Sequence, residues 1–234
     1  MTERGRGALR RSADRLEIGP SSLRWDHGGL TIDVDEISSP LPRHIRGTIR
    51  VEPVTTNDVP FILDERGGHV WQPIAPSARV RVEFDAPDLA WEGIGYFDTN
   101  RGNEPLERGF SEWTWSRSDL EEETIVFYDA TRRDGSSCAL ALRFDHSGEP
   151  IAFEAPPRAT MARTHWRVTR DTRCEENRAI VQRTFEDTPF YARSLVETTL
   201  FGRRTAFMHE SLSLARFANP IVRCMLPFRM PRRG

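Results

Sequence analysis

The sequence predicts an all-β protein whose strands close into a barrel or fold into a sandwich. Short runs of alternating apolar and polar residues recur through most of the 234 residues, as half-buried strands require. Turn signals rich in Gly, Asp and Pro separate these runs. No segment keeps a helical apolar stripe beyond about two or three turns. About a dozen strands are therefore expected, which is typical of sandwiches and barrels.

The first half of the chain contains two predicted hairpins. Alternating runs within residues 22–37 flank His27-Gly28-Gly29, and the glycines suit the turn. A second turn, Asp64 to Gly68, separates short runs at 61–63 and 69–74. Further strands are expected at 46–51 and 80–84, the latter ending in a turn at 85–88.

The second half continues the pattern. Residues 124–131 and 137–144 alternate on either side of a turn that contains Asp134-Gly135, one of the stronger local hairpin signals. The remaining expected strands lie at residues 151–154, 165–170, 178–185, 195–201 and 204–214.

Three regions are expected along the chain. Residues 1–15 form a basic N-terminal segment, residues 16–216 form the β-barrel region with a subdivision near 120–160, and residues 217–234 form an arginine-rich apolar tail. The mixture of apolar and arginine side chains in this tail suits binding to an anionic membrane surface. A terminal strand and frayed end that dock on the core explain the same residues equally well.

Composition excludes several classes of protein. The net charge of −2 gives no electrostatic case for nucleic acid binding. The cysteines, Cys138, Cys174 and Cys224, have neither disulfide-framework nor metal-site spacing. No signal peptide or spanning helix is expected, because no apolar run approaches about 18 residues. We therefore expect a soluble or peripheral protein in a reducing compartment, without metal.

The stretch from Trp91 to Arg117 is the densest in aromatic residues and carboxylates. Aromatic faces beside a carboxyl group can hold an apolar substrate next to a proton donor. A glycosidase-like pair formed by Asp98 with Glu104, Glu107 or Glu112 is an alternative, but sequence spacing does not give the distance between carboxyl groups.

Two pairs of residues share a strand face by their spacing. His69 with Trp71, and Tyr96 with Asp98, are two residues apart, so each pair points the same way in an extended strand. Adjacent strands would bring all four side chains together. The alternative is that they are ordinary hairpin and core residues.

Four blocks of sequence carry a resemblance to a known family. In order, LEIGPSSLRWDHGGLTIDVDEISSPLPRHIRGTIRV, HVWQPIAPSARVRVEF, GYFDTNRGNEPLERGFSEWTWSR and VFYDATRRDG resemble the carotenoid 1,2-hydratases, or hydroxyneurosporene synthases. The similarity runs from about Leu16 to Met230, and family members carry further sequence before the position that matches Met1. The resemblance implies a lipocalin-like fold, with two barrels in the complete protein. One complete and one partial barrel would fit this chain.

The resemblance also implies an activity. The family adds water to the terminal 1,2 double bond of acyclic carotenoids without a cofactor, and its functional His-x-Trp and Tyr-x-Asp pairs match His69 with Trp71 and Tyr96 with Asp98. Asp98 would be the acid, which must be neutral to protonate an alkene, and burial favours that form. His69 would orient or reprotonate it, while Trp71 and Tyr96 face the carbocation.

Further expectations follow from this substrate. Four aromatic side chains, Trp91, Phe97, Trp113 and Trp115, would line the polyene site. Because long carotenoids reside in the bilayer, the protein should be cytoplasmic and peripheral to the inner or photosynthetic membrane. The alternatives are a non-catalytic lipocalin-like carrier of apolar ligands and a related barrel enzyme that acts on another polyene.

Overall fold

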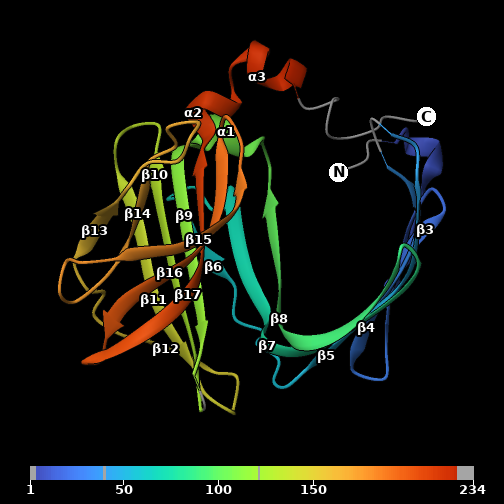
Figure 1. The fold of residues 1–234 in the computed structure, drawn as a ribbon, viewed down its shortest axis with the longest axis horizontal. Coiled ribbons are helices and arrows are strands. Elements are labelled where there is room, and N and C mark those ends of the chain that lie inside the picture. The colour runs from blue at the N-terminus through green and yellow to red at the C-terminus, as the bar shows by residue number, and fades with distance from the viewer. Residues whose placement is uncertain (1–3, 39–40, 121, 226–234) are drawn as a thin grey trace. The chain divides into compact units, whose positions relative to one another are not determined.

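The computed structural model describes residues 4–38, 41–120 and 122–225, and antiparallel sheets dominate it (Figure 1). The predicted all-β class is confirmed. Two compact units are present. Unit 1 comprises the described part of residues 1–56, residues 75–97 and residues 224–225, whereas unit 2 comprises residues 57–74 and 98–223. The subdivision expected near 120–160 and the limits at 15/16 and 216/217 remain predictions.

Unit 1 is a meander of antiparallel strands in the order β1-β2-β3-β4-β5-β7. The hairpin of residues 21–37 turns at His27 and Gly28, whose φ angles of 48° and 75° lie in the left-handed region that glycine adopts readily. The hairpin expected within residues 22–37 is therefore confirmed. The elements are η1 (Arg6–Ala8), β1 (Leu9–Arg11), β2 (Arg15–Ile18), β3 (Ser21–Asp26), β4 (Gly29–Ile37) and β5 (His44–Pro53).

One face of the unit 1 sheet is apolar. Leu30, Val51, Ala75 and Ala78 are its buried residues. The partly buried residues packed against them include Trp25, whose indole stacks on Phe97 with ring centroids 6.3 Å apart. The period of two in β4 and β5 produces this face, because alternate side chains of a strand point the same way.

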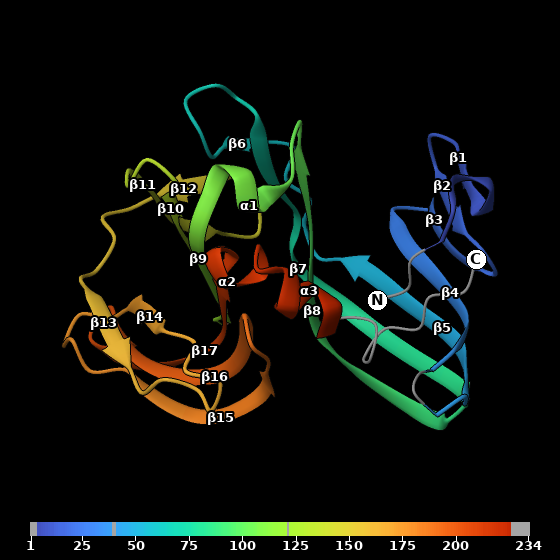
Figure 2. The ribbon, with the colours of Figure 1, turned by 90° about the horizontal axis from the view of Figure 1, so that it is seen from above.

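Unit 2 contains a seven-stranded sheet in the order β12-β11-β10-β9-β17-β16-β15, with β13 and β14 as a separate pair (Figure 2). The Asp134-Gly135 hairpin joins β10 to β11 as predicted, with Gly135 at φ 87°. The strands are β6 (Phe61–Ile62), β9 (Phe110–Asp119), β10 (Thr124–Arg132), β11 (Ser137–Phe144), β12 (Pro150–Ala152), β13 (Arg158–Met161), β14 (Arg170–Arg173), β15 (Ile180–Asp187), β16 (Tyr191–Leu200) and β17 (Arg203–Ser213). The helices are α1 (Leu106–Gly109), α2 (Leu214–Phe217) and α3 (Pro220–Met225), whose last two residues belong to unit 1.

Two long strands contribute to both units. They are β7 (His69–Ala86) and β8 (Asp88–Gly102), which pair with each other. Within unit 2, β6 pairs with the first residues of β7, so that Phe61 lies opposite Trp71. The hairpin predicted around residues 64–68 is thus confirmed. None of the helices in the described part of the chain has the length and apolar character needed to cross a bilayer.

The strand expected at residues 165–170 is wrong. Residues 165–169 lie outside any strand, and only Arg170 enters β14. Side chains accept hydrogen bonds from the backbone N–H groups of this segment instead. Asp187 accepts the His165 N–H at 2.7 Å, and Thr164 accepts the Val168 N–H at 3.1 Å. Such local hydrogen bonds compete with strand pairing.

Unit 2 buries a group of polar side chains that we call the histidine cluster: Ser116, Thr172, His209 and Ser211. The His209 ring is fully buried, with Nδ1 2.7 Å from the Ser116 hydroxyl and Nε2 2.9 Å from the Ser211 hydroxyl. Burial, assisted by the charge of Arg170, lowers the pKa of His209 to about 3. His209 is therefore a neutral structural residue, because both ring nitrogens are already hydrogen-bonded within the core.

This buried imidazole predicts a pH dependence of stability. Above about pH 6.5 His209 is neutral in both the folded and the unfolded state, so its full contribution to the free energy of unfolding is present. Between about pH 6.5 and 3 the unfolded chain binds a proton that the folded protein excludes. The free energy of unfolding should then fall by about 1.4 kcal/mol for each pH unit of acidification. The free energy of unfolding, measured with urea at several pH values, should change less steeply with pH in His209→Gln than in the wild type. Equal slopes would contradict the assignment.

Candidate active site

The side chains of Trp71 and Asp98 meet in unit 2. The indole Nε1–H of Trp71 donates a hydrogen bond of 2.8 Å to Oδ2 of Asp98. Trp71 is fully buried, whereas Asp98 is half-buried on β8. The sequence analysis placed these residues together from their spacing, and the structure confirms that they are neighbours. Their catalytic roles remain predictions.

Aromatic rings hold the Trp71 indole in place. The rings of Phe61 and Tyr128 lie 5.3 Å and 4.9 Å from it, centroid to centroid. Phe61 reaches it through the β6–β7 pairing, and Tyr128 comes from β10. Contacts of this kind add to the burial energy and restrict ring motion. The predicted contact between the Trp71 ring and a carbocation remains a prediction.

Tyr128 is a neighbour that the sequence analysis missed. Its hydroxyl lies 3.4 Å from the side-chain oxygen of Asn100, two residues after Asp98 on the same face of β8. Burial raises the pKa of Tyr128, and the charge of Asp98 raises it further. The phenol is therefore neutral and acts as a hydrogen-bond donor. The block VFYDATRRDG contained it, but nothing local distinguished it from a core tyrosine.

His69 pairs with a second carboxylate, Asp64, which was predicted only as a turn residue. The ring Nδ1 of His69 lies 2.9 Å from Oδ2 of Asp64, and only 5% of the His69 surface is exposed. Burial alone would favour the neutral acid of Asp64. Hydrogen bonds from the Gly68 N–H, the His69 ring and the Arg66 N–H outweigh it and lower the pKa of Asp64. Asp64 is thus a carboxylate, and His69 is oriented by it. The partnership between His69 and Asp98 remains a prediction.

We refer to Asp64, His69, Trp71, Asp98 and Tyr128 as the acid site. Two of the predicted substrate-binding residues lie next to it. The Trp113 ring is 5.5 Å from the ring of Tyr128. Trp115 stands directly opposite Tyr128 in the β9–β10 ladder and is 7% exposed. The structure therefore brings Trp113 and Trp115 onto the sheet face that carries Tyr128.

The other predicted aromatic residues belong to unit 1. Tyr96 precedes Asp98 on the same face of β8. Phe97 packs in the apolar face of unit 1. Trp91 is 48% exposed. Their roles in catalysis and in substrate binding remain predictions.

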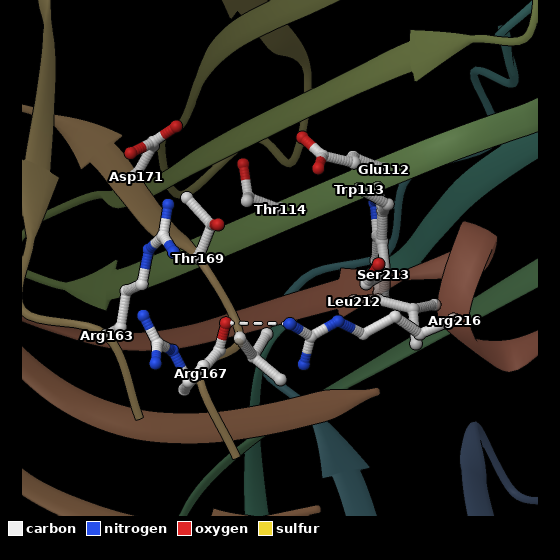
Figure 3. Close-up of a pocket in the computed structure, with 11 residues that line it drawn as sticks. Glu112, Trp113, Thr114, Arg163, Arg167, Thr169, Asp171, Leu212, Ser213 and Arg216 are labelled. Carbon is white, nitrogen blue, oxygen red and sulfur yellow. Dashed lines mark hydrogen bonds between the residues drawn. The ribbon is translucent and has the colours of Figure 1, made fainter. Parts of the chain in front are cut away.

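Two of the glutamates considered as glycosidase partners, Glu107 and Glu112, lie in different environments. Glu107 binds the guanidinium of Arg223. Glu112 lines a polar cavity of about 220 Å³ in unit 2, with Arg163, Arg167 and Asp171 among the other lining residues (Figure 3). The guanidinium of Arg216 reaches into this cavity and donates to the Arg167 carbonyl at 3.1 Å.

A metal site is not formed by the described residues, since no three His, Cys, Asp or Glu side chains converge suitably. The side chains of the acid site carry carboxyl, imidazole, indole and phenol groups. Together they can donate a proton, accept one and surround an apolar reactant with aromatic rings.

Comparison with known proteins gives a consistent picture. The family model described as carotenoid hydratase CrtC matches residues 1–234. An acyclic carotenoid 1,2-hydratase from Thiocapsa roseopersicina is 55% identical over the whole chain, which spans 58% of that protein. One from Cereibacter sphaeroides is 43% identical, again over the whole chain, and 84% of it is covered.

A solved structure supports the fold. The crystal structure of CghA with Sch210972 superposes with a TM-score of 0.53 at 10% sequence identity, covering 88% of this chain and 70% of that one. The likeness concerns the fold alone, and it confirms the predicted lipocalin-like class. The described strands of the two larger sheets follow open orders rather than closed rings.

Proposed function

Because the chain belongs to the carotenoid hydratase CrtC family, we propose that it adds water to the terminal 1,2 double bond of an acyclic carotenoid such as neurosporene or lycopene. The observation that carries this proposal is the Trp71–Asp98 hydrogen bond within a group of aromatic rings. The chain spans 58% of the Thiocapsa roseopersicina relative, so the activity of the longer protein is proposed for it rather than assumed.

The acid site supports a two-step reaction. Protonated Asp98 delivers its proton to the less substituted alkene carbon, which leaves a tertiary carbocation. Water then adds to the cation and loses a proton to a base, giving the 1-hydroxy carotenoid. The aromatic faces of Trp71 and Tyr96 would stabilise the cation, an interaction that strengthens when water is excluded. Trp71 also fixes one oxygen of Asp98 through its N–H.

The direct test is to incubate the purified chain with lycopene or neurosporene in liposomes and to measure product mass by liquid chromatography and mass spectrometry. A product heavier by one water is the expected result. A folded protein that binds the polyene without converting it would identify a carrier. An isomeric or cyclised product without added water would identify another reaction of the polyene.

We also propose that the substrate is taken up at a membrane surface through the C-terminal segment. The part of the predicted tail from residue 226 onward lies outside the described residues. In the described part, the side chain of Ile221 on α3 is 73% exposed. Arg216 and Arg223 lie on the same segment. Phe217 packs on Phe190, with ring centroids 5.0 Å apart, so it belongs to the body of unit 2. The exposed apolar side chain of Ile221 carries this proposal, because the guanidinium groups of Arg216 and Arg223 bind the Arg167 carbonyl and Glu107.

Replacing Ile221 with Glu should weaken vesicle binding. The change removes an apolar side chain and adds a charge that an anionic surface repels, so we expect about a tenfold loss of affinity. Sedimentation with anionic vesicles measures it. The matched control is Ile151→Glu, at an exposed position on β12. Equal losses in both variants, or none in Ile221→Glu, would argue against this segment.

A further inference from the structure

The two oxygens of Asp64 have separate partners. Oδ1 accepts the backbone N–H groups of Arg66 and Gly68, both at 3.0 Å. Oδ2 faces Nδ1 of His69 at 2.9 Å. The first oxygen therefore holds the β6–β7 turn, and the second holds the imidazole. Since a carboxylate only accepts hydrogen bonds, Nδ1 must carry the proton.

Glycines confine the imidazole of His69 from two sides. A Cβ atom at Gly102 would lie 2.7 Å from Cδ2 of the ring, and one at Gly109 would lie 2.8 Å from Cε1. The Phe110 ring meets the imidazole edge-on, with centroids 5.0 Å apart and an interplanar angle of 76°. The ring thus occupies a slot that any side chain at residue 102 or 109 would fill.

The remaining ring nitrogen of His69, Nε2, differs from Nδ1 in its hydrogen bonding. It is buried and has no hydrogen-bond partner among the described residues. A buried nitrogen with a lone pair and no partner costs free energy unless a ligand or water supplies a donor. Of the two ring nitrogens, Nε2 is therefore the one left to bind a ligand or a water.

We propose that Asp64 is a positioning residue that sets the tautomer of His69, with the proton on Nδ1 and the lone pair on Nε2, so that Nε2 accepts a proton from the reacting water. This inference rests on the proposed hydration. When water oxygen bonds to the carbocation, one water proton passes to Nε2, and the resulting imidazolium is stabilised by the Asp64 carboxylate. The imidazolium then returns a proton to the Asp98 carboxylate, and the site regains its starting state.

Asp64→Asn separates the two functions of this residue. The amide oxygen can still accept the turn N–H groups of Arg66 and Gly68. Its NH₂ group then faces Nδ1, which must become an acceptor, so the ring proton should move to Nε2. Nitrogen-15 NMR of histidine-labelled protein reports the tautomer directly, and His69→Gln assigns the signal. We expect an Nδ1–H tautomer in the wild type and an Nε2–H tautomer in Asp64→Asn.

Activity provides the second readout. With the lone pair pointing at Asp64→Asn rather than at the substrate, kcat should fall by about 100-fold with little change in KM. The control is Asp134→Asn, because Asp134 also caps a hairpin turn, through Ser136, and its hydrogen bonds among the described residues involve no histidine. That variant should keep the wild-type tautomer and rate.

Either readout can overturn the inference. An Nε2–H tautomer in the wild type would do so, and it would do so even if Asp64→Asn failed to fold. A full wild-type rate in a folded Asp64→Asn variant would do so as well. If the wild type makes no hydroxy carotenoid yet shows the predicted change of tautomer, the proposed hydration fails while the assignment of Asp64 to His69 stands.

Discussion

Asp98→Asn should reduce formation of the hydroxy carotenoid by at least about 1,000-fold, since a positioned acid typically contributes factors of this size. An amide has no proton acidic enough to transfer to an alkene. The amide oxygen can still accept the Trp71 N–H that Asp98 accepts in the wild type. The loss should therefore come from chemistry and not from folding. Product mass from lycopene or neurosporene, measured beside the wild type, checks it.

Two controls make this result specific. Circular dichroism should show an unchanged β-sheet spectrum, and polyene binding should persist, because the aromatic rings around Trp71 are untouched. If Asp98→Asn converts the polyene at the wild-type rate, Asp98 is not the acid, and the proton must come from another group of the site.

Arg173→Met should lower the free energy of unfolding by about 3 kcal/mol, as expected when a buried charge loses its partner. Asp129 is only 4% exposed, and its Oδ2 accepts the Nε–H of Arg173 at 3.0 Å. Its Oδ1 also binds the Arg173 guanidinium. The guanidinium of Arg158, 3.4 Å from Oδ1 of Asp129 and with its side chain 43% exposed, offers only a partial substitute. Urea unfolding followed by tryptophan fluorescence measures the difference.

The matched control is an exposed ion pair in unit 1. Arg81 and Glu92 are 2.8 Å apart with side chains 61% and 68% exposed, so Arg81→Met should cost less than about 1 kcal/mol. Adding Asp129→Asn to Arg173→Met should recover part of the loss by removing the unpaired charge. Equal effects for Arg173→Met and Arg81→Met would show that burial does not govern the Asp129 pair.

Local sequence patterns predicted much of this fold. The period of two and the Gly-containing turns located the hairpins at residues 22–37, 61–74 and 124–144, because neighbouring strands joined by short turns need no distant information. The strand at 165–170 failed for a physical reason: its alternation is real, but Thr164 and Asp187 bind the backbone that a neighbouring strand would have paired.

The candidate site was predictable only in part. Same-face spacing and the family resemblance selected His69, Trp71 and Asp98. Tyr128 could not be selected, since its position depends on which strands lie across from one another, a property that no local pattern contains. Asp64 was visible as a turn former. The contact of Asp64 Oδ2 with His69 forms only in the folded hairpin, so the sequence did not predict it.

Strands β7 and β8 contribute residues to both units, and this has a consequence during synthesis. Residues 57–74, which carry Asp64, His69 and Trp71, leave the ribosome before residues 98–223, which complete unit 2. The strands of unit 1 can pair once residue 97 has emerged, while Trp71 still lacks Asp98 and Tyr128. Contacts between segments so distant in sequence form slowly, and apolar surface stays exposed meanwhile. The residues of the acid site are thus among the last to be shielded from aggregation.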